Sequence, residues 1–148
     1  MPLALPPALN IPFLIHVFLE TPASLNFFFR PNNQLSSPAP QAHALIKQYA
    51  VLLLSSSLIA LVFAFREADD TSRRVAGALA VYHVAPLMRA VERIGAGVEG
   101  KKEREREALR GVGGRGKAEG DLGGPWVHAV MHASALGALM WEFGCGGK

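Results

Sequence analysis

Two pairs of residues in this sequence have the spacing that places both side chains on one face of an α-helix. His16 and Glu20 are four residues apart, and so are His128 and His132. Side chains at positions i and i+4 are neighbours on a helix surface. A carboxylate beside an imidazole can move a proton, and neutral imidazoles bind metal ions and haem. With His83 as a further histidine, the sequence holds candidate groups for acid–base or metal chemistry.

These groups lie inside long apolar stretches. Hydrophobic residues make up 50% of the chain and charged residues 18%, and the charges gather between Arg89 and Asp121. A soluble helical domain normally carries charges along the outer face of every helix. The stretch from Lys47 to Arg66 has no charge between its two ends, and a helix over 41–65 can cross the roughly 30 Å hydrocarbon core of a bilayer.

Three further apolar segments, 11–29, 72–94 and 125–143, can pack against this helix. In the 72–94 segment the uncharged part, 75–88, is short for a bilayer, so we expect the flanking arginines to reach toward the two interfaces. The sequence therefore predicts an all-α fold: a single membrane domain over 1–148 that forms a four-helix transmembrane bundle with up-down-up-down order. A flexible charged loop over 95–124 is expected between the third and fourth helices.

The distribution of Lys and Arg predicts the orientation. Four spans place both termini on one side, which holds Arg66, Arg73, Arg74 and Lys148, four of the fifteen basic residues; the other eleven lie on the opposite side. Cytoplasmic loops carry the excess of Lys and Arg. We expect the 95–124 loop in the cytosol and both termini in the lumen, in the endoplasmic reticulum or another internal membrane.

Two classes of partner and site are disfavoured. The net charge is +3, but the basic residues of 101–110 alternate with acidic ones, which argues against a nucleic-acid surface. A single cysteine, Cys145, excludes an intrachain disulfide and a thiolate zinc cluster.

Polar residues at bilayer depth are the candidate site. In the predicted bundle Glu20, His83 and His132 fall in the middle third of the membrane, where an acidic side chain costs roughly 2.5–3.5 kcal/mol, so we expect Glu20 to face inward. The hypothetical catalytic set is Glu20, His16 and His132. The candidate ligand-binding residues are Asn26, Ser56, Tyr82, His83 and His128. No metal ligand and no cofactor is assigned in this interpretation.

Three functions stay open. The leading one is non-enzymatic: the polar groups set the helix register, and the protein binds a lipid-like or sterol-like ligand in the bilayer or serves as an accessory subunit of a membrane protein partner. One alternative is an isomerase in which Glu20 moves a proton and His16 or His132 orients it. The other is a haem or metal carrier that uses His128, His132 and His83.

Three stretches carry a resemblance to a known group: LIHVFLETPASLNFFFRP at 14–31, DDTSRRVAGALAVYHVAPLMRA at 69–90 and GPWVHAVMH at 124–132. They resemble a group of small four-span fungal integral membrane proteins of unknown function, over most of the chain except 95–124. This resemblance implies four helices and no particular activity. The spacing of His16 and Glu20 is also similar to the H-x-x-x-E pair of the sterol-isomerase and sigma-2-receptor superfamily, an analogy that applies to the isomerase alternative only.

Overall fold

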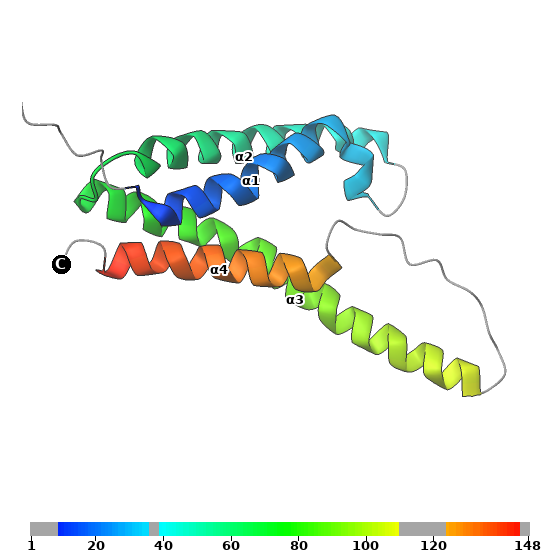
Figure 1. The fold of residues 1–148 in the computed structure, drawn as a ribbon. Coiled ribbons are helices and arrows are strands. Elements are labelled where there is room, and N and C mark those ends of the chain that lie inside the picture. The colour runs from blue at the N-terminus through cyan, green and yellow to red at the C-terminus, as the bar shows by residue number, and fades with distance from the viewer. Residues whose placement is uncertain (1–8, 36–38, 110–123, 146–148) are drawn as a thin grey trace, which may run out of the picture. The chain divides into compact units, whose positions relative to one another are not determined.

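The computed structural model describes residues 9–35, 39–109 and 124–145, with the backbone alone described for 102–109, and these residues form helices and no strands. In the part of the chain that the structure describes, four α-helices follow one another (Figure 1). They are α1 (Ile11–Phe29), α2 (His43–Ala64), α3 (Asp70–Leu109) and α4 (Gly124–Cys145), and two 3-10 turns, η1 (Pro31–Gln34) and η2 (Pro40–Ala42), connect α1 to α2. The prediction of an all-α chain with four helices is confirmed.

The chain divides into two compact units. The first unit comprises Met1–Ala80 and Gly137–Lys148, and the second comprises Val81–Leu136. The first therefore contains α1, α2, the beginning of α3 and the end of α4. The second contains the middle and end of α3 and most of α4.

In the first unit α1 and α2 form an antiparallel hairpin. At one end the backbone N–H of Asn10 donates to the carbonyl oxygen of Ala64 over 2.9 Å. Next to it the ring of Phe13 stacks on that of Phe63, with the ring centroids 5.6 Å apart. At the other end, near the connecting turns, the ring of Phe27 stacks on that of Tyr49, with the ring centroids 5.9 Å apart. Contacts at both ends therefore hold the two helices side by side.

The start of α3 is set by a capping carboxylate. Oδ1 of Asp69 accepts hydrogen bonds from the backbone N–H of Ser72 at 2.7 Å and from its hydroxyl at 2.9 Å. These donors, the backbone N–H first, stabilise the ionised carboxylate and lower the pKa of Asp69, and Arg66 at 3.2 Å acts in the same direction. The cap satisfies backbone and side-chain donors in the first turn of the helix.

The flexible loop expected over 95–124 is partly wrong, because α3 continues as a helix to Leu109. Lys, Arg, Glu, Ala and Leu fill positions 101–109, and all five types have high helix propensity. Local propensity therefore extends the helix beyond the predicted end near residue 94. Positions 110–123 of the predicted loop lie outside the described residues.

Polar side chains are buried on one face of α1, and large apolar side chains are exposed on all four helices. In α1 the buried residues include His16, Glu20 and Ser24, whereas Phe18 and Phe29 are 76% and 73% exposed. Large apolar side chains on the other helices are exposed in the same way: Leu45, Leu52, Val62, Val81, Trp126, Val130 and Trp141.

By length and composition, α1 and the segment Pro40–Ala64 can each cross a membrane. The fold is therefore all-helical with two candidate membrane spans among four helices.

Candidate functional site

A buried polar stripe runs along α1 in the first unit. His16, Glu20 and Ser24 are spaced four residues apart and are 0%, 1% and 2% exposed. This spacing keeps all three side chains on one helix face. Because that face of α1 is turned toward the interior, all three are buried together. His16 and Glu20, two of the three predicted catalytic residues, therefore share a buried surface.

His16 is held against α2 through a serine. Its Nε2 lies 3.2 Å from Oγ of Ser56, and the same Oγ donates its proton to the carbonyl oxygen of Leu53 over 2.8 Å. Because the serine proton is used in that bond, the oxygen accepts from the imidazole, which places the proton of neutral His16 on Nε2. Ser56, predicted as a ligand-binding residue, thus contacts this ring, and its role toward a ligand stays a prediction.

Ser24 provides a second contact between the same two helices. Its hydroxyl donates a 2.8 Å hydrogen bond to the carbonyl oxygen of Ala50. The sequence interpretation missed this residue, although extending the spacing of His16 and Glu20 by four positions leads to it.

Within the first unit, the end of α4 contacts the beginnings of α1 and α3. Nδ2 of Asn10 donates to Oε1 of Glu142 over 3.3 Å, and both residues are buried. The guanidinium of Arg73 donates from Nε to the carbonyl oxygen of Phe143 at 3.2 Å. The sequence analysis did not identify Glu142 as a site residue. Its partner Asn10 is distant in the chain, and the sequence of α4 carries no signal for that contact.

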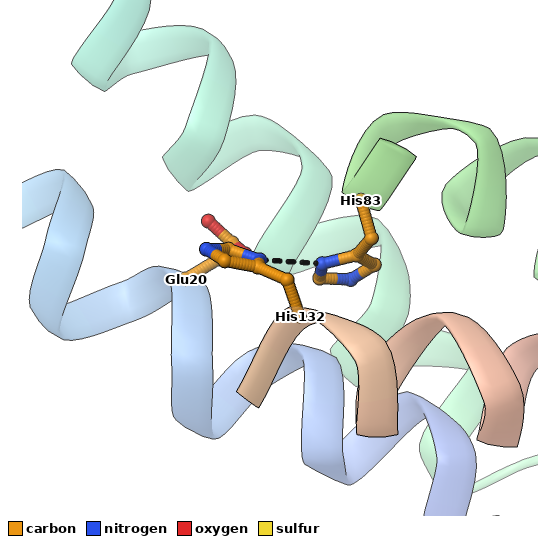
Figure 2. A group of neighbouring side chains, drawn as sticks. All are labelled: Glu20, His83 and His132. Carbon is orange, nitrogen blue, oxygen red and sulfur yellow. Dashed lines mark hydrogen bonds between the residues drawn. The ribbon is translucent and has the colours of Figure 1, made fainter. Parts of the chain in front are cut away.

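In the second unit two histidines from different helices meet. Figure 2 shows His83 on α3 and His132 on α4 joined by a hydrogen bond between their Nδ1 atoms, which are 3.0 Å apart. The ring edge of Tyr82 approaches His83 with a centroid distance of 5.2 Å. His128 stacks on His132 at 6.4 Å with nearly parallel rings. Burial decreases along the three histidines: His83 is buried, His132 is half-buried and His128 is exposed.

A bond between two ring nitrogens restricts their protonation. One Nδ1 must donate and the other must accept, so at most one of the two carries a proton. The pair can pass a proton from one ring to the other, or its two lone pairs can bind a cation once that proton leaves. The histidine pair is compatible with proton transfer or with metal binding, and its geometry does not identify a substrate for either.

The remaining predicted residues have separate positions. Asn26 is half-buried on α1, and the hydrogen bond described for it is the one that its backbone carbonyl accepts from the N–H of Arg30. The predicted catalytic set divides between the two units, because His16 and Glu20 belong to the first and His132 to the second. A joint role of Glu20 and His132 therefore stays a prediction.

Comparison with protein-family models, with curated proteins and with solved structures finds no match to this chain.

Proposed function

We propose that this chain is an integral membrane protein whose four helices cross the bilayer in up-down-up-down order, and that it acts without covalent chemistry by binding lipid-like molecules. The observation that carries the proposal is the reversed distribution of side chains in α1, with Phe18 exposed and Glu20 buried. Burying a Phe side chain away from water is worth about 1.5–3 kcal/mol, so water disfavours a surface of this kind. Hydrocarbon favours it, because lipid tails solvate the apolar face, while the polar face is kept away from the lipid inside the protein.

The helix ends in the first unit support the alternating order. The beginning of α1 bonds to the end of α2 through Asn10 and Ala64, and the beginning of α3 bonds to the end of α4 through Arg73 and Phe143. Asn10 also bonds to Glu142 of α4. An up-down-up-down bundle brings the N-terminal ends of α1 and α3 and the C-terminal ends of α2 and α4 to one interface of the membrane. These contacts join the same four helix ends.

A structural role for the polar stripe supports the non-enzymatic interpretation. His16 and Ser24 both contact α2, and the two contacts lie on one face of α1. Interhelical hydrogen bonds of this kind hold transmembrane helices in register. These two contacts account for the burial of His16 and Ser24 without a substrate.

The excess of Lys and Arg orients the proposed bundle with 95–124 in the cytosol and both termini in the lumen of an internal membrane. An accessory role beside another membrane protein fits the same exposed apolar surface.

Extraction and labelling test the proposal together. Cys145 is exposed near the end of α4 and is the sole cysteine in the sequence, so a membrane-impermeant maleimide reports on that end alone. We expect the protein to stay in the membrane fraction after carbonate extraction. We expect Cys145 to be labelled only after the membrane is permeabilised, which gives the reagent access to the lumen. Asn33→Cys in a Cys145→Ser background is the matched control, and it should be labelled from the cytosol. Carbonate extraction of the protein, or labelling of both positions from one side, would refute the proposed topology.

A metal carrier is the second candidate, because Nδ1 of His83 and Nδ1 of His132 are 3.0 Å apart. Two nitrogens on a tetrahedral Zn²⁺ ion, each at 2.0–2.1 Å, are separated by about 3.3 Å, so a small opening of the pair fits the ion. Purified protein titrated with Co²⁺ should then bind the ion and His83→Ala should not, with His43→Ala as a control outside the pair. Equal binding by both variants, or no binding by the parent protein, removes this candidate.

A further inference from the structure

A groove lies between the end of α1 and the beginning of α2 in the first unit. It has a volume of about 620 Å³ and is lined by Phe28, Ala44, Lys47, Gln48, Val51 and Leu52. Four of these six side chains are apolar, and Leu52 is 67% exposed. The groove thus offers an apolar wall of the kind that an acyl chain contacts.

The groove also has a cationic end. Nζ of Lys47 lies 5.7 Å from the centroid of the Phe28 ring, so its ammonium group stands at the aromatic wall. Arg30 caps the end of α1 close by in the chain, and the sequence from 21 to 66 contains no Asp or Glu. The opposite end of the hairpin differs, because Arg66 forms an ion pair with Asp69 at 3.2 Å.

We propose that this groove binds an anionic phospholipid, with its phosphate at Lys47 and the amide of Gln48 and one acyl chain along Val51 and Leu52. This inference rests on the proposed membrane location. In the proposed orientation the Lys47 end faces the cytosol, and the cytoplasmic leaflet is the one that carries anionic lipids.

Charge complementarity favours a lipid over a second copy of this chain. A symmetric contact through the groove would bring two Lys47 side chains together. Like charges across an interface oppose association, whereas an anionic headgroup neutralises them. A zwitterionic lipid offers the same acyl chain with no net charge, so it serves as the comparison ligand.

Native mass spectrometry of the protein in mild detergent, with equal amounts of phosphatidylserine and phosphatidylcholine, tests the proposal. The parent protein should retain phosphatidylserine preferentially, and Lys47→Gln should reduce that preference by about fivefold, the factor expected for one basic residue at a membrane surface. Arg74→Gln removes an equal charge from an exposed position on α3 and should leave the preference unchanged.

A second variant tests the apolar wall independently of charge. Ala44→Trp places a large ring in the groove and should reduce retention of both lipids. Equal retention of the two lipids by the parent protein, or equal losses in Lys47→Gln and Arg74→Gln, would overturn the lipid site while leaving the membrane location intact. Carbonate extraction of the parent protein would instead refute the membrane proposal itself.

Discussion

The hydroxyl of Ser24 donates a 2.8 Å hydrogen bond to the backbone carbonyl of Ala50, which joins α1 to α2 through a side chain that is 2% exposed. Ser55 on α2 serves as a comparison, because this exposed serine donates its hydroxyl proton to the carbonyl oxygen of Val51 in its own helix. One serine thus connects two helices and the other connects none.

Ser24→Ala should destabilise the protein by about 0.6 kcal/mol, the average for an interhelical hydrogen bond in a membrane. Ser55→Ala should change the stability by less, because it removes no contact between helices. Unfolding in mixed micelles with increasing SDS measures both variants. A larger effect at Ser55 than at Ser24 would contradict the structural role of the α1–α2 contact.

Phe13 and Phe18 lie on the same helix with opposite surroundings, since Phe13 is 0% exposed and Phe18 is 76% exposed. Phe13→Ala should lower the stability by about 3–5 kcal/mol, because it leaves a cavity beside Phe63 and removes a ring stack. Phe18→Ala should alter the stability by less than about 0.5 kcal/mol, because it removes an exposed side chain that makes few contacts within the protein. The same SDS titration compares the two, and equal losses would show that the two rings share one environment.

Glu20→Gln should leave the stability unchanged or raise it, because a neutral amide is less costly to bury than a carboxylate of the same shape. Thermal unfolding in detergent gives the comparison, and Glu20→Lys provides a variant that should destabilise. A marked loss of stability in Glu20→Gln, with the fold otherwise retained, would indicate an ionised Glu20 that holds a required partner.

His83 and His132 should show different protonation at Nδ1, since one nitrogen donates and the other accepts. Nitrogen-15 NMR of labelled imidazoles distinguishes a protonated from an unprotonated ring nitrogen. A double-mutant cycle with His83→Ala and His132→Ala should give a coupling of about 0.5–2 kcal/mol. Matching Nδ1 signals together with zero coupling would mean that the two rings do not bond.

The cap of α3 should make the stability depend on pH in acid. The pKa of Asp69 is lowered in the folded protein by the Ser72 donors, so the folded state binds this proton more weakly than the unfolded state does. Its stabilising contribution is complete above the unfolded pKa of about 3.9 and is lost as the pH falls through the lower folded value.

Asp69→Asn keeps a capping oxygen but cannot titrate, so its stability should fall less steeply below about pH 4 than that of the parent protein. Unfolding midpoints measured from pH 5 downward provide the test. Identical slopes in the two proteins would show that Asp69 does not contribute to the acid dependence.

Helix formation and the buried face of α1 could be predicted from the sequence. The length of the apolar stretches indicates helices over 11–29 and 41–65, and the spacing of His16 and Glu20 indicates one face, because both properties depend only on residues close in the chain. The end of α3 was predicted too early, since the glycines of 95–100 outweighed the helix formers that follow them.

The sequence by itself determined a helical chain with polar groups on chosen helix faces and an apolar surface around them, because hydropathy and i,i+4 spacing are local. Only the tertiary structure decided that His83 bonds to His132, that Ser56 contacts His16, and that Lys47 stands at the mouth of a groove. Such partners depend on how far each helix is rotated and shifted against its neighbour. That rotation follows from packing over whole helices, so no short sequence pattern specifies it.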